Sequence, residues 1–145
     1  MSETYSQRMR VTYATDHSVK YVGHLDMARA WERAMRRARF PLAYSQGFNP
    51  QPRIQFAAAL PVGFTGNAEV VDIFLDEPLI PDSLLAGLAS VLPPGIRAFG
   101  AEPVSRELPS LQSQIRGATY RVEVETDEAD NLFSARLRTF LDRPE

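Results

Sequence analysis

The sequence predicts an α+β fold of the ferredoxin-like class, a βαββαβ sandwich that spans residues 6–105. Three observations lead to this prediction. Some segments alternate apolar and polar residues with a period of two, as strands do, and other segments place apolar residues at helical spacing. Clusters of Gly and Pro separate these segments. The segments follow one another in the order strand, helix, strand, strand, helix, strand.

The first strand and the first helix lie in the N-terminal third of the chain. Arg8–Thr15 alternates in polarity and is rich in Val, Thr and Tyr, which favours a strand. After a turn, Val19–Val22 has room for a short returning strand. Over His24–Arg39 the period becomes helical, and Met27 and Trp31 fall on one apolar face. That face is suited to packing against a sheet.

The remaining elements of the sandwich follow an ordered loop. Pro41–Pro52 is rich in turn-forming residues, so we expect a structured connection there. Arg53–Leu60 and Ala68–Leu75 should form an antiparallel pair of strands. Pro81–Leu92 has leucines at helical spacing, and Ile96–Val104 is expected as the last strand.

The C-terminal part of the chain has a second, smaller pattern. Residues 106–117 form a polar linker with scattered leucines. Ala118–Thr126 alternates as a strand does, and Asp130–Leu141 is an amphipathic helix. A single strand and a single helix bury too little surface to fold alone. We therefore expect residues 118–145 to be a strand–helix extension of the first domain, or the truncated start of a second, similar domain.

The composition excludes several classes of site and indicates a compartment. The chain has no Cys, which excludes disulfides, thiol nucleophiles and metal centres held by cysteine. No apolar run is long enough for a transmembrane helix, and the N-terminus lacks the apolar stretch of a signal peptide. We therefore expect a cytoplasmic protein that does not engage a membrane.

The charge is distributed unevenly, although the net charge is only −2. Nine basic and three acidic residues lie between Arg8 and Phe56, a local charge of +6. Seven arginines and fourteen acidic residues follow from Ala57 to Glu145, a local charge of −7. A basic first third can bind a polyanion although the net charge is negative, because binding depends on the local electrostatic potential.

The most informative segment joins a basic helix face to a loop with polar and aromatic side chains. The arginines of the predicted helix lie opposite its apolar face, where they either solvate the helix or bind phosphates. In the loop, either Tyr44 or Phe48 could lie under a base, with Gln46 or Asn49 at base edges. Of the two rings, we expect Phe48 to pack in the core and Tyr44 to make the contact, with Gly47 supplying a positive φ. The expected nucleic-acid contacts are Lys20, Arg29, Arg33, Arg36, Arg37, Tyr44, Gln46, Asn49 and Arg53.

The helix start holds the one candidate for catalysis. His24 falls on the buried side of the helix by angle, while Asp26 turns outward. We expect Asp26 to cap free backbone N–H groups of the first turn. His24 is either hydrogen-bonded at the junction of helix and sheet or a general acid–base. With His17 as the only other histidine and no Cys, we predict neither a metal site nor a cofactor.

Four sequence blocks together resemble a known bacterial family. They are GHLD at Gly23–Asp26, arginines at 29, 33 and 37, PLAYSQGFNPQP at Pro41–Pro52, and ALPVGF at Ala59–Phe64. Over Arg8–Gly100 the chain resembles the radical SAM-linked protein family, a domain of unknown function. The family motif positions in the helix start and the loop are His24, Asp26, Ser45, Gly47, Phe48, Pro50 and Pro52. Two positions differ, with Gly23 where Ser is usual and Gln51 where His is common.

The resemblance implies a partner. Members occur alone or fused behind cobalamin-binding-type radical SAM enzymes, often near genes for ribosomes and RNA processing, and are longer than this chain. Without Cys, this chain cannot hold the iron–sulfur cluster of such an enzyme. The resemblance therefore implies an accessory role rather than catalysis.

Three hypotheses about function follow. The first is an RNA-binding module that presents tRNA or rRNA to the radical SAM partner for modification. The second is a metal-independent endoribonuclease that uses His24, Tyr44 and Arg37 around the scissile phosphate. The third is a protein–protein adaptor whose arginines dock an acidic patch of the partner.

Overall fold

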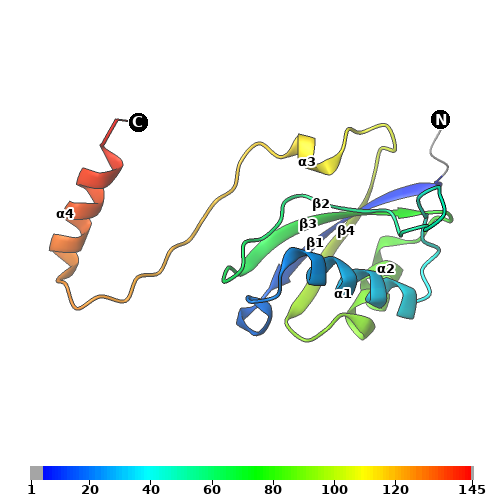
Figure 1. The fold of residues 1–145 in the computed structure, drawn as a ribbon, viewed down its shortest axis with the longest axis horizontal. Coiled ribbons are helices and arrows are strands. Elements are labelled where there is room, and N and C mark those ends of the chain that lie inside the picture. The colour runs from blue at the N-terminus through cyan, green and yellow to red at the C-terminus, as the bar shows by residue number, and fades with distance from the viewer. Residues whose placement is uncertain (1–4, 145) are drawn as a thin grey trace. The chain divides into compact units, whose positions relative to one another are not determined.

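A computed structural model describes residues 5–144 and confirms the α+β fold (Figure 1). Four strands form one antiparallel sheet in the order β2-β3-β1-β4. This is the strand order of the ferredoxin-like split βαβ arrangement. The elements of the sandwich are β1 (Gln7–Thr15), α1 (His24–Arg37), β2 (Ile54–Phe56), β3 (Gly66–Leu75), α2 (Pro81–Val91) and β4 (Ile96–Val104).

The core lies between the sheet and the two helices α1 and α2, which cover the same face (Figure 1). Alternate residues of β1 point into it, because successive side chains of a strand face opposite sides. Trp31 of α1 is fully buried and meets Tyr13 of β1 with ring centroids 4.9 Å apart. The apolar stripe predicted from helical spacing is therefore the face that packs on the sheet.

Two short segments differ from the prediction. The turn after β1 forms a 3-10 helix, η1 (His17–Val19), and no returning strand follows at Val19–Val22. Asp16 caps this turn by accepting a hydrogen bond from the N–H of Ser18. β2 pairs with β3 over three residues only, since it is an edge strand that leaves the sheet before Pro61.

A buried ionic cluster lies on the sheet face opposite the helices. The Asp72 carboxylate of β3 is fully buried. It accepts hydrogen bonds from Nε of Arg8 at 2.8 Å and from Nε of Arg10 at 2.8 Å. The hydrogen bond to Asp72 and the charges of Asp72 and Glu102 raise the pKa of the Arg10 guanidinium, against the effect of burial. These contacts tie the two central strands together on their outer face.

The same cluster fixes the segment after β4. The Arg8 guanidinium donates to the carbonyls of Leu108 at 2.7 Å and Pro109 at 2.9 Å. The short helix α3 (Leu111–Gln114) follows, and its buried Leu111 donates its N–H to Oε1 of Gln55 at 3.0 Å. The first half of the segment expected as a linker is therefore anchored to the sheet. The boundary between the two compact units falls between Ile115 and Arg116.

The second unit, Arg116–Glu145, contains the predicted helix as α4 (Asp130–Leu141). The strand predicted at Ala118–Thr126 is wrong, since this segment has no regular structure. A strand needs a neighbouring backbone to pair with, and residues 118–126 form no strand ladder within the described part of the chain. Tyr120, Val122 and Val124 carry the alternating pattern and are all more than half exposed. In residues 5–144 no helix is long and apolar enough to cross a bilayer.

Candidate nucleic-acid interface

Helix α1 presents its arginines to solvent, on the side opposite Trp31. Arg29, Arg33, Arg36 and Arg37 are all exposed, as the helical angles predicted. Two of them have acidic neighbours: Arg29 lies 3.4 Å from Asp26, and Arg36 lies 2.7 Å from Glu32. Ion pairs of this exposed kind contribute about 0.2–1 kcal/mol each, so a phosphate can replace either acid.

Arg33 and Arg37 have no ion-pair partner within residues 5–144. They stand four residues apart, which places them on neighbouring turns of the same face. Arg39 follows as an exposed residue with φ 58, just past the end of α1. Three guanidinium groups thus remain available at the C-terminal end of the helix.

Asp26 does not have the capping role expected from the sequence. The N-cap residue of α1 is Gly23, and no side chain caps the first turn. The Asp26 carboxylate instead accepts a hydrogen bond from Arg29. Gly23 has φ −70 and ψ 162, an extended conformation that starts the helix without a side-chain acceptor.

The sequence from Arg33 onward is poor in negative charge. Residues 33–68 hold five arginines and no Asp or Glu. This stretch therefore carries a local charge of +5, although the whole chain is slightly acidic. No sequence neighbour on the C-terminal side competes with an incoming anion for Arg33, Arg36, Arg37 or Arg39.

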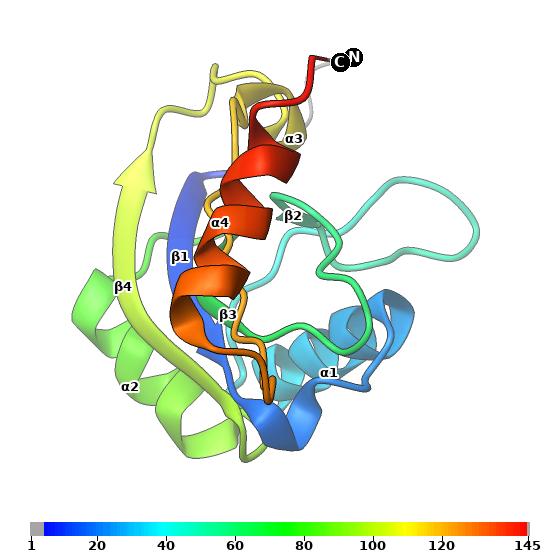
Figure 2. The same cartoon turned by 90° about the vertical axis from the view of Figure 1, so that its left-hand side faces the viewer.

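Six residues, 38–43, link Arg37 to an ordered loop at Tyr44–Pro52, which we call the Phe48 loop. Tyr44 and Pro52 form an isolated bridge at its base. Inside it, Ser45 donates its N–H to the carbonyl of Gln51 at 2.9 Å, and Gln51 returns an N–H to Oγ of Ser45 at 3.0 Å. The loop protrudes from the body of the first unit (Figure 2).

The tip of the Phe48 loop contradicts one prediction. Phe48 does not pack in the core, because the loop extends away from the sheet and leaves its side chain fully exposed, at 111%. Tyr44 is exposed at 40%. Gln46 and Asn49 are also exposed, and Gly47 has φ 132, which a residue with a side chain rarely adopts.

Two residues expected at the interface lie elsewhere. The Arg53 guanidinium stacks over the rings of Tyr5 and Phe74, at 4.9 and 4.8 Å from their centroids. Phe74 belongs to the sheet face opposite the helices, so Arg53 is engaged there. Lys20 precedes the other end of α1 and places its Nζ 5.0 Å from the Tyr21 ring.

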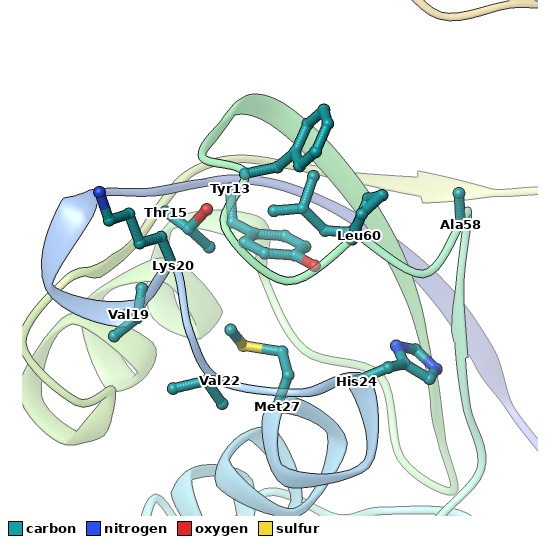
Figure 3. A pocket seen from close by; sticks show the side chains of 11 residues that line it. Tyr13, Thr15, Val19, Lys20, Val22, His24, Met27, Ala58 and Leu60 are labelled. Carbon is teal, nitrogen blue, oxygen red and sulfur yellow. The ribbon is translucent and has the colours of Figure 1, made fainter.

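His24 also lies at this N-terminal end of α1, where two of the sequence blocks meet. Its ring contacts the Phe56 ring edge-to-face with centroids 5.4 Å apart, and within the described residues it makes no hydrogen bond. Gly63 donates its N–H to the carbonyl of Lys20 at 2.6 Å, which joins the ALPVGF segment to the turn before the helix. Both segments line a pocket together with Tyr13 (Figure 3).

The pocket is too small for a substrate. Its volume of about 20 Å³ holds roughly one water molecule. Burial, with a further contribution from the negative charge of Glu69, raises the pKa of the Tyr13 hydroxyl far above its ordinary range. Tyr13 therefore stays protonated at neutral pH.

The structure also separates the proposed nuclease residues. His24 and Arg37 are the first and last residues of α1, which places them about 20 Å apart along the helix axis. Tyr44 comes after the C-terminal end of α1, the end where Arg37 lies, and His24 is at the opposite end. One scissile phosphate cannot contact both ends of the helix. In the part of the chain that is described, no three His, Asp or Glu side chains gather to hold a metal ion.

Glu69, opposite Tyr13 in the sheet, gives a pH-dependent prediction. Burial raises its pKa above the ordinary value, so the folded state holds the proton more tightly than the unfolded state. Protonated Glu69 therefore contributes to the free energy of unfolding. The contribution is fully present below about pH 4.3 and is lost as pH rises through the raised pKa of the folded state. Glu69→Gln should unfold like the wild type at pH 3.5 and be the more stable protein at pH 7. A stability difference independent of pH, measured by urea unfolding, contradicts this.

A bacterial protein family matches most of the chain. It is described as an uncharacterized protein conserved in bacteria (DUF2344), and the match covers residues 8–145. No curated protein matches the chain.

Proposed function

The chain belongs to the bacterial DUF2344 family, and we propose that it is an accessory RNA-binding module. The observation that carries this proposal is the set of exposed arginines in the C-terminal half of α1, Arg33, Arg36 and Arg37, at the start of a stretch, residues 33–68, that has no acidic residue. Arginine binds phosphate in a bidentate manner and stacks on bases, which suits a folded RNA.

The proposal includes a partner. The resemblance to radical SAM-linked proteins suggests that a radical SAM enzyme of the cobalamin-binding type modifies the tRNA or rRNA that this module holds. Two features of the chain support a division of labour. It has no Cys for an iron–sulfur cluster, and the pocket beside His24 has room for about one water molecule.

Filter binding of tRNA and rRNA fragments across a salt series tests RNA binding. Each phosphate neutralised by a cation contributes about 0.7–0.9 to the slope of log K against log salt. Contacts by three or four arginines therefore predict a slope of about −2 to −4. A slope near zero contradicts the proposal, because binding would then not depend on phosphates.

A second function, a protein–protein adaptor, is favoured by one specific observation. The loops at the N-terminal end of α1 expose large apolar side chains next to one another. They are joined by the Gly63–Lys20 hydrogen bond, and the exposed residues are Tyr21, Leu25, Val62 and Phe64. Such a cluster on a small domain marks a protein interface.

Co-purification distinguishes the adaptor from the RNA module. After nuclease treatment, an adaptor should still retain the radical SAM enzyme, and Leu25→Asp/Val62→Asp should release it. Loss of the enzyme on nuclease treatment alone indicates that RNA bridges the two proteins.

The endoribonuclease hypothesis is tested by incubating labelled RNA in EDTA, where cleavage that disappears in His24→Ala would support it.

A further inference from the structure

We infer that the Phe48 loop recognises an unpaired nucleotide, with the Phe48 ring stacked on its base. This inference rests on the proposed RNA-binding function and names the part of the RNA that the site selects. An exposed phenylalanine gains no burial energy on folding and favours association when no partner covers it. Phe48 is the most exposed large apolar side chain of the described residues, at 111%.

The backbone of the Phe48 loop is ordered by hydrogen bonds, and this ordered loop presents the Phe48 side chain to solvent. The two hydrogen bonds between Ser45 and Gln51 close the loop above the Tyr44–Pro52 bridge. Its base is fixed to the sheet, because Ala43 donates its N–H to the carbonyl of Phe74 at 2.9 Å and accepts from the N–H of Arg53 at 2.8 Å. A ring presented on an ordered loop loses little conformational entropy on binding.

The neighbours of Phe48 suit a base. Gln46 and Asn49 flank it and are exposed, and each side-chain amide offers both donors and an acceptor to a base edge. Tyr44–Pro52 contains no charged residue, so nothing in the loop repels the phosphates of a nucleic acid. Within residues 5–144, Phe48 makes no aromatic or cation–π contact that a base would need to displace.

The Phe48 loop lies next to the arginines in the sequence. It follows the C-terminal end of α1, where Arg33, Arg37 and Arg39 are exposed. These arginines favour a polyanion over an apolar protein pocket as the occupant. In a continuous duplex both faces of every base are already stacked, so an aromatic side chain reaches a base only in a loop, a bulge or an end. The geometry therefore points to RNA with unpaired bases beside phosphates held by α1.

Fluorescence anisotropy with two matched RNAs tests this inference. One is a hairpin with a single-stranded loop, and the other is a blunt duplex with the same stem. Phe48→Ala should weaken binding of the hairpin by about 5- to 150-fold, the range for removal of one base–aromatic stack, and leave duplex binding unchanged. Phe48→Trp should retain hairpin binding, and its fluorescence should be quenched by the hairpin alone.

A control variant and three outcomes decide between explanations. Phe140→Ala removes another exposed aromatic ring, in the second unit, and should bind both RNAs as the wild type does. Equal binding by Phe48→Ala and wild type, while Arg33→Glu/Arg37→Glu loses binding, overturns the stacking and leaves the RNA-binding function standing. Equal losses on hairpin and duplex overturn selection of unpaired bases. If the wild type binds neither RNA, both the stacking and the proposed function are wrong.

Discussion

Asp72→Ala is expected to lower the free energy of unfolding by about 3–5 kcal/mol. Asp72 is fully buried, and it is the carboxylate that offsets the charges of Arg8 and Arg10. Arg8 is only 2% exposed, so its guanidinium cannot recover water when the carboxylate is removed. An uncompensated buried charge is far more costly than the loss of an exposed ion pair. Urea unfolding followed by circular dichroism measures the change.

Asp76→Ala is the matched control for this prediction. It removes the same side chain four residues further along, just after the end of β3, where the carboxylate is exposed. Its effect should stay within about 0.5 kcal/mol. If Asp72→Ala is no more destabilising than Asp76→Ala, the buried cluster does not stabilise the sheet. Asp72→Asn keeps the shape and removes the charge, so it should lie closer to Asp72→Ala than to the wild type.

Arg33→Glu/Arg37→Glu is expected to have the largest effect on RNA binding. The two arginines without ion-pair partners would be replaced by carboxylates that repel phosphates. Binding of tRNA at moderate salt should weaken by about tenfold or more, and the slope of log K against log salt should become shallower by about 1–2. The same filter-binding series as for the wild type provides both quantities.

The control for this variant must carry the same change in total charge. Arg121→Glu/Arg138→Glu reverses two exposed arginines in the second unit. It should weaken binding far less, because the proposed interface lies on α1 and the Phe48 loop. Equal losses in the two double variants would mean that only the net charge matters, and the interface would be wrong.

The periodic part of the structure could be predicted from the sequence. In α1 the 3.6-residue period fixed both the buried position of Trp31 and the exposed positions of the arginines. The antiparallel pair of β2 and β3 followed from alternation and turn residues. Such patterns are local in sequence, and an element shows them whatever partner it packs against.

The parts that failed depend on partners distant in sequence. Asp72 lies inside an apolar strand, and its partner Arg8 is 64 residues away in sequence. No local sequence pattern therefore predicts the cluster. Ala118–Thr126 has the alternation of a strand but lacks a strand to pair with in the described structure. Whether Phe48 is buried depends on the direction of a loop, which its own residues do not determine.

Crosslinking in cells followed by sequencing of the attached RNA tests the RNA-binding function most directly. The wild-type chain should recover a defined set of RNAs enriched in tRNA or rRNA fragments, and Arg33→Glu/Arg37→Glu should recover about tenfold less. Recovery at background from the wild type, or equal recovery from both proteins, would contradict binding of RNA by this arginine face.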